Sequence, residues 1–184
     1  MRIIAGTARS LPLKALDGKD TRPTTDRIKE TLFNILQSGI SGCRFLDLFA
    51  GSGQIGLEAL SRGAEYAVFV ENSKKACAVI EDNIRFTKFG DKSRLLAMDA
   101  LCAVRSLEGT GAFDYIFLDP PYASGLEQEI LATLASSGLL KEDGRIIVEA
   151  SRHTDFSYAA QLGLAITKEK IYKTNKPLFF AKEG

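Results

Sequence analysis

From Phe45 onward the chain alternates short apolar runs with stretches of helical periodicity. Runs with the length of buried strands occur at 45–49, 66–70, 94–97, 115–118 and 145–149. Segments with the spacing of amphipathic helices lie between them, at 55–62, 74–86, 101–107 and 126–136. Because near-continuous apolar strands that alternate with helices are typical of a parallel sheet covered on both faces, we expect a doubly wound α/β fold.

The two ends of the chain follow other patterns. Residues 2–15 contain Gly6, Ser10 and Pro12, which interrupt regular helices and strands. This segment therefore predicts a small hairpin or extended arm. A helix follows, capped near Thr24, Thr25 or Asp26 and running to about residue 37. Its expected buried face is formed by Ile28, Leu32, Ile35 and Leu36. At the other end, a short helix at 155–162 and a hairpin from 164–172 and 178–181 would give the sheet an antiparallel edge.

The length of 184 residues suits one compact unit. We expect an N-terminal arm and helix over residues 1–40, packed on a main domain over residues 41–184 with a seven-stranded sheet. Formal net charge is only +1, but residues 1–45 and 150–184 are basic and the middle is acidic. A polyanionic partner would therefore meet the two ends of the chain, and the N-terminal extension is expected to face it.

Several classes of protein are disfavoured. No apolar run approaches the ~20 residues that span a bilayer, and the first residues do not resemble a signal peptide. The three cysteines form no CxxC pair, and His153 is the only histidine. We therefore expect no metal site, no disulfide framework, no membrane partner and a cytoplasmic location.

A glycine-rich loop follows the first apolar strand. Residues 51–56 read Gly-Ser-Gly-Gln-Ile-Gly, a literal GxGxxG before a helix, and Glu71 follows 20 residues after Gly51. This is the pattern of a dinucleotide site, but Asp47 would place a carboxylate near the ligand. A carboxylate is unfavourable beside a pyrophosphate and favourable beside a cation. The sequence Asp-Leu-Phe-Ala-Gly-Ser-Gly at 47–53 is therefore more typical of a site for S-adenosylmethionine (SAM).

Acidic residues recur at the ends of the next two strands. Glu71 could accept hydrogen bonds from two ribose hydroxyls, and Asp99 from the adenine amine, although Asp99 could also cap the next helix. The complete set expected to bind SAM is Asp47, Phe49, Ala50, Gly51, Gly53, Glu71, Asn72, Asp99 and Ala100.

The tetrapeptide Asp119-Pro120-Pro121-Tyr122 follows the fourth apolar strand. It resembles the (D/N)PP(Y/F) motif of amino-methyltransferases. Asp119 and the Pro120 carbonyl can accept the two N–H groups of an exocyclic amine and hold its nitrogen toward a methyl donor. Tyr122 offers a ring on which a base can stack. These three residues are the expected catalytic set, and Pro121 is expected to contact the substrate.

Over nearly its whole length the chain resembles the RsmD family of bacterial 16S ribosomal RNA guanine-N2 methyltransferases. The resemblance rests on 2–6, 22–27, 30–34, 46–53, 56–63, the 119–122 motif and Val148-Glu149. It implies a class I SAM-dependent methyltransferase fold. The implied substrate is N2 of one guanine, position 966 in the family's naming, within the small ribosomal subunit. Arg22, Thr24 and Arg27 are expected to bind the RNA, and Lys29 could also meet phosphates near this helix start.

Four alternatives stay open on the residues alone. The amine could belong to another base, such as DNA adenine, or to a protein amide. The glycine loop could serve a nicotinamide oxidoreductase. The chain could also be an RNA-binding assembly factor without activity.

Overall fold

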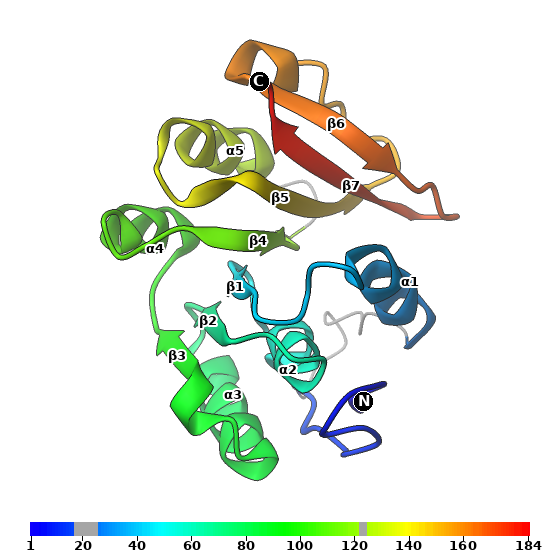
Figure 1. The fold of residues 1–184 in the computed structure, drawn as a ribbon, viewed down its shortest axis with the longest axis vertical. Coiled ribbons are helices and arrows are strands. Elements are labelled where there is room, and N and C mark those ends of the chain that lie inside the picture. The colour runs from blue at the N-terminus through cyan, green and yellow to red at the C-terminus, as the bar shows by residue number, and fades with distance from the viewer. Residues whose placement is uncertain (17–25, 122–124) are drawn as a thin grey trace.

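The computed structural model describes residues 1–16, 26–121 and 125–184. Within these ranges seven strands form one sheet in the order β3-β2-β1-β4-β5-β7-β6 (Figure 1). The strands are β1 (Arg44–Asp47), β2 (Tyr66–Val70), β3 (Ser93–Leu96), β4 (Phe113–Leu118), β5 (Leu140–Ser151), β6 (Leu164–Glu169) and β7 (Asn175–Lys182). Strands β1 to β5 are parallel to one another, and β7 is antiparallel to β5 and β6. This confirms the α/β class I methyltransferase fold, with the antiparallel pairing at one edge.

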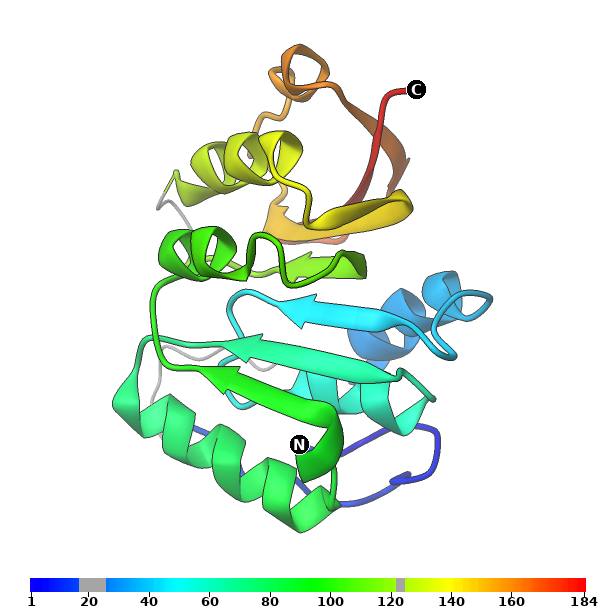
Figure 2. The ribbon, with the colours of Figure 1, turned by 60° about the vertical axis from the view of Figure 1, so that its left-hand side comes forward.

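Helices cover both faces of this sheet (Figure 2). The described helices are α1 (Asp26–Leu36), α2 (Gln54–Ser61), α3 (Lys74–Thr87), α4 (Ala100–Leu107) and α5 (Leu126–Ser136), with short 3-10 turns η1 (Gly90–Lys92) and η2 (Ala159–Leu162). One apolar core lies between the sheet and α4, α5 and η2; a second lies between the sheet and α1, α2 and α3. In the described part of the chain, no helix combines the length and apolar character needed to cross a bilayer.

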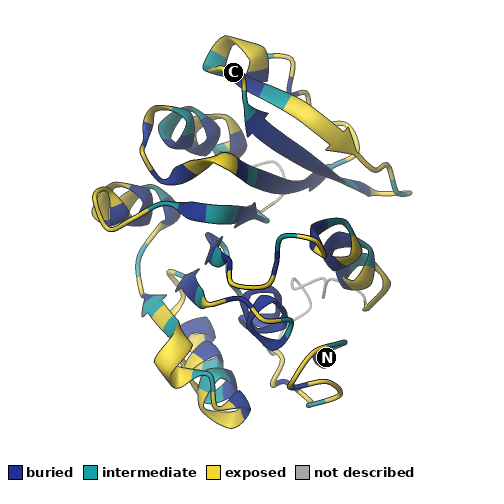
Figure 3. Ribbon diagram, in the orientation of Figure 1, coloured by how far each residue is buried: buried dark blue, intermediate teal, exposed yellow. Residues whose placement is uncertain are grey.

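Helix α2 is buried on every side (Figure 3). Its inner side packs so closely on β2 that a Cβ at Gly56 would lie 2.3 Å from the Phe69 ring. Its outer side is covered by the N-terminal arm, residues 1–16. Glu58 accepts hydrogen bonds from the N–H groups of Ile4 and Ala5 at 2.8 and 3.1 Å. The arm is therefore fastened to the helix that follows the glycine loop.

The arm itself forms a tight loop closed by a bridge between Arg2 and Pro12, as the sequence predicts. Helix α1 differs from its expected packing. Lys29 is fully buried, and its Nζ donates to the Arg2 carbonyl at 2.5 Å, while Ile28 is only half-buried. Phe33, which the predicted apolar face omits, has no exposed surface. On the buried face of α1, Lys29 therefore contacts the arm, whereas Phe33 stacks on Phe45 of β1.

Candidate active site

The candidate site lies where the strand order reverses. From β1 the chain winds outward to β2 and β3, then returns through α4 to β4 on the other side of β1. Asp47 ends β1, and Asp119 directly follows β4. Because β1 and β4 are adjacent and parallel, the structure brings these two predicted residues to the same edge of the sheet. This is where open α/β sheets bind ligands.

The glycine loop connects β1 to α2 through left-handed backbone. Gly51 and Gly53 have φ values of +56° and +79°, which side-chain-bearing residues rarely adopt. The Ala50 N–H donates to the Val70 carbonyl at 2.9 Å, and the Gly53 N–H donates to the Ala50 carbonyl at 2.6 Å. The loop is thus tied to the end of β2.

Glu71 holds this loop from the next strand. Its Oε2 accepts the Gly51 N–H at 3.0 Å, and its Oε1 accepts the Ser73 N–H at 2.8 Å. The side chain is half-buried. Since each carboxylate oxygen can accept more than one hydrogen bond, Glu71 can still bind hydroxyl groups.

Asp47 is only 1% exposed, and both carboxylate oxygens lack a hydrogen-bond partner. Its pKa is raised to about 7, mainly by burial and to a smaller extent by the Glu71 charge, against a lowering effect of the Phe49 and Gly56 backbone. An unpartnered buried carboxylate costs folding free energy. It is suited to a ligand that brings a positive charge or N–H donors.

A third carboxylate, Glu149, joins this edge from β5. Burial raises the pKa of Asp119, as do the charges of Glu149 and Asp47. Glu149 is 6% exposed, and burial raises its pKa as well. Asn175 of β7 opposes that rise by donating to Glu149 Oε1 at 2.6 Å. Three acidic side chains therefore converge around the end of β4.

The other residues expected at the cofactor lie near the same edge. Asp99 caps α4 by accepting the Cys102 N–H at 2.9 Å, so the helix-cap role foreseen for it is present. Asp99 is exposed, and hydrogen bonds from Cys102 lower its pKa. Ala100 is buried, Phe49 half-buried and Asn72 exposed.

The 119–122 motif is described in part. Pro120 is buried and Pro121 is exposed. Tyr122 lies outside the described residues, as do the predicted RNA contacts Arg22 and Thr24. Arg27 is exposed at the start of α1. The suggestion that Lys29 meets phosphates is wrong for this conformation, because Lys29 is fully buried among Arg2, Asp26 and Glu58.

Asn83 of α3 links the glycine loop to the arm. Its Nδ2 donates to the Ser52 carbonyl at 2.9 Å and to the Lys14 carbonyl at 3.1 Å. Its Oδ1 accepts the Lys14 N–H at 2.8 Å. Asn83 is 1% exposed, so one buried amide holds two segments that lie far apart in the sequence.

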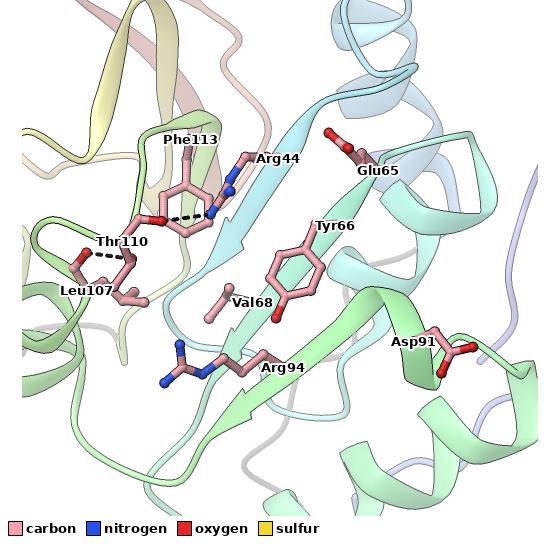
Figure 4. Close-up of a pocket in the computed structure, with 9 residues that line it drawn as sticks. All are labelled: Arg44, Glu65, Tyr66, Val68, Asp91, Arg94, Leu107, Thr110 and Phe113. Carbon is pink, nitrogen blue, oxygen red and sulfur yellow. Dashed lines mark hydrogen bonds between the residues drawn. The ribbon is translucent and has the colours of Figure 1, made fainter.

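A separate hollow of about 500 Å³ lies toward the opposite ends of the strands (Figure 4). Arg44 begins β1 and lies 5.8 and 5.3 Å from the ring centres of Tyr66 and Phe113. None of the described residues predicted for the cofactor or the substrate lines this hollow. The acidic cluster is thus spatially distinct from it.

Sequence reasoning assigned no role to Glu149 or Asn175. The available signal was an acidic residue after the apolar run Ile146-Ile147-Val148, the arrangement already recognised at Asp47. Asn175 gave no such signal, because its contact with Glu149 depends on the antiparallel pairing of β5 and β7.

Comparison with known proteins gives consistent matches. A family model described as "Conserved hypothetical protein 95" matches residues 1–181. Ribosomal RNA small subunit methyltransferase D of Escherichia coli K12 is 38% identical over 150 residues, covering 82% of this chain and 74% of that protein. The protein of the same name from Haemophilus influenzae is 36% identical over 153 residues, covering 83% and 79%. A solved structure of Escherichia coli yhhF, described as a candidate methyltransferase, has a TM-score of 0.89 and 32% identity, covering 100% of this chain and 98% of that chain.

Proposed function

Because the chain belongs to the RsmD family, we propose that it methylates the exocyclic N2 of one guanine in 16S ribosomal RNA, with SAM as the methyl donor. The observation that carries the proposal is that Asp47 and Asp119 lie at the ends of two adjacent parallel strands. The first is a buried carboxylate without a partner beside a glycine loop. Asp119 is the first residue of the 119–122 motif, which can hold an amine, and it follows the adjacent strand β4.

The residues present fit SAM. Asp47 offers a buried acceptor for a positively charged ligand, and Gly51 has open space where a side chain would project. We assign Glu71 to the ribose hydroxyls and Asp99 to the adenine amine, with Phe49, Ala50, Gly53, Asn72 and Ala100 completing the site. When bound, SAM supplies an electrophilic methyl group on a sulfonium.

The 119–122 motif would hold the acceptor base. Asp119 and the Pro120 carbonyl accept the two N–H groups of the amine, which fixes the nitrogen and directs its lone pair. Pro121 contacts the base, and Tyr122 stacks on it. Catalysis by this arrangement is mainly positioning and electrostatic stabilisation. It requires no metal ion.

The RNA would approach over the N-terminal side of the molecule. Arg22, Thr24 and Arg27 are assigned to its backbone, since basic side chains near a helix start can meet phosphates. A base inside the small ribosomal subunit must leave its stack to reach Asp119, at a cost of a few kcal/mol. A cytoplasmic location follows from this substrate.

The test is methyl transfer from labelled SAM to small ribosomal subunits that lack the modification. Free rRNA, DNA and bulk protein are assayed in parallel, and labelled nucleosides are identified. We expect N2-methylguanine at a single site in 16S rRNA. Label in adenine of DNA, in another RNA base or in protein would replace the proposed substrate.

Asp119→Ala separates the chemistry from cofactor binding. We expect unchanged SAM affinity in calorimetry and methyl transfer lower by about 10²–10⁴-fold, because the amine loses its main acceptor. Full turnover by this variant would refute the role assigned to Asp119. Failure to bind SAM would point to an effect on the fold or on Asp47.

A further inference from the structure

The inference concerns the neighbour of Asp119, and it rests on the proposed function. Strands β4 and β5 are parallel, and Leu118 pairs with Val148. The next residues, Asp119 and Glu149, therefore follow at the same level of adjacent strands. Both continue the row of Phe117 and Ile147, which face the core under α1 and α2. The two carboxyl groups are directed to the same side of the sheet.

Glu149 is built into this position. It is 6% exposed, and Asn175, also 6% exposed, donates to its Oε1 at 2.6 Å. Asn175 begins β7, so the antiparallel strand supplies the group that fixes the glutamate. A buried carboxyl held by one amide beside a second carboxyl is costly to maintain. Apolar side chains could fill the same space at a lower cost in folding free energy.

We propose that Glu149, held by Asn175, is a positioning residue that prepares Asp119 to take the proton from the base amine. In the transfer, the nitrogen lone pair takes the methyl group, and the sulfur keeps the electron pair of the broken methyl–sulfur bond. One N–H bond breaks, its electron pair stays on nitrogen, and its proton passes to Asp119. Glu149 shares that proton until it leaves to solvent.

The charges around Asp119 support this role. Among the described residues, the charged groups that act on Asp119 are Glu149 from β5 and Asp47 from β1, and both raise its pKa. A carboxylate with a raised pKa is a better acceptor for the departing proton. Because the two groups interact, the pair titrates as a unit.

The experiment compares Glu149→Gln, Asn175→Ala and the control Glu142→Gln. Glu142 lies on the same strand with its side chain 88% exposed. Glutamine keeps the shape of Glu149 and removes its charge, so the pKa of Asp119 should fall. The acid limb of the pH profile of kcat/KM should therefore move down by on the order of one pH unit. Removing the Asn175 donor raises the pKa of Glu149, so Glu149 carries less charge beside Asp119. Asn175→Ala should therefore also move the limb down, by a smaller amount than Glu149→Gln. Glu142→Gln should leave it in place.

Two further measurements distinguish a positioning role of Glu149 from a purely structural one. Glu149→Gln should lower kcat on small subunits by about 10-fold or more and leave KM within about twofold. Carbon-13 NMR of the labelled carboxyl groups should show the same downward shift of the Asp119 titration in the ligand-free protein. The NMR titration does not depend on the RNA substrate, so it tests the pair even if the wild-type protein methylates something else.

An Asp119 titration and an acid limb that stay unchanged in Glu149→Gln would overturn the proposal. If Glu149→Gln does not fold, the downward shift in Asn175→Ala decides, and its absence would equally overturn the proposal. A wild-type protein without transfer to guanine would instead overturn the proposed function.

Discussion

At the scale of single residues, Asp47 makes the site sensitive to pH. Its carboxyl is buried without a partner, and its pKa lies at about 7. Below pH 7 most Asp47 carboxyl groups are protonated, and a cationic ligand favours the ionised form. Ligand binding at low pH must therefore remove this proton, which weakens the affinity. We therefore expect SAM affinity to rise between pH 6 and 8, as measured by calorimetry. The same series with Asp47→Asn should be weaker and flat.

The same residue affects stability in the opposite direction. The unfolded chain ionises Asp47 near pH 4 and the folded protein at about 7, so the folded state holds the extra proton between these values. Its contribution to stability is therefore present at low pH and lost as pH rises from about 4 to 7. At pH 8 the ligand-free Asp47→Asn variant should be more stable than the wild type by on the order of 1–3 kcal/mol. Equal denaturant midpoints would contradict this.

The 119–122 motif and the acid at the first strand end could be identified as candidates from residue types alone. Asp47 interrupts an apolar run and Asp119 directly follows one, and the structure places them at the ends of adjacent strands. Lys29 shows the limit of such reasoning. A lysine near a helix start is usually exposed, but here the arm covers it and offers the Arg2 carbonyl. Only the tertiary contact decides between these states.

At the scale of elements, the contact between α2 and β2 depends on one glycine. Gly56→Ala should destabilise the protein by about 1–3 kcal/mol, because the new Cβ would lie 2.3 Å from the Phe69 ring. The matched control is Gly138→Ala, where nothing lies within 4 Å and the effect should be small. Thermal unfolding of both variants is the measurement. A similar melting temperature for the two would show that Phe69 moves aside at little cost.

Elements with strong periodicity were predicted well. The helix expected over 126–136 is observed as Leu126–Ser136, and the strand expected over 66–70 as Tyr66–Val70. Strand β5 begins at Leu140, earlier than expected, because β4 pairs with Leu140 as well as with Arg145. The polar stretch Lys141–Asp143 lies in an irregularity of the register between these two pairs. The helix expected over 155–162 forms only a 3-10 turn at 159–162. Local sequence does not contain the pairing partners that settle these cases.

At the scale of the whole molecule, the alternation of strands and helices was enough to predict the sheet and the edge that carries the site. The sequence did not specify the order of the last two strands. In the structure, β7 lies between β5 and β6. That insertion brings Asn175 to Glu149. The part of the site that depends on chain topology therefore required the structure.

The distribution of charge over the molecule leads to a prediction about RNA. Arg27 is exposed on α1, in the basic N-terminal region, whereas Arg105 is exposed on α4 across the sheet. We expect Arg27→Ala to weaken binding to small subunits and to reduce the slope of log K against log salt by about 1. Arg105→Ala should change neither quantity. Identical salt slopes for Arg27→Ala and the wild type would remove Arg27 from the RNA interface.

The amide of Asn83 ties the arm at Lys14 to the glycine loop at Ser52. A ligand that holds the arm in its docked position therefore also holds the loop in its present shape. We therefore expect a SAM site at the loop and an RNA site that includes the arm to share a coupling free energy, and such a coupling is reciprocal. Whatever factor SAM adds to the affinity for RNA, RNA must add to the affinity for SAM. The order in which the two ligands arrive would then change the path to the ternary complex and leave its stability the same.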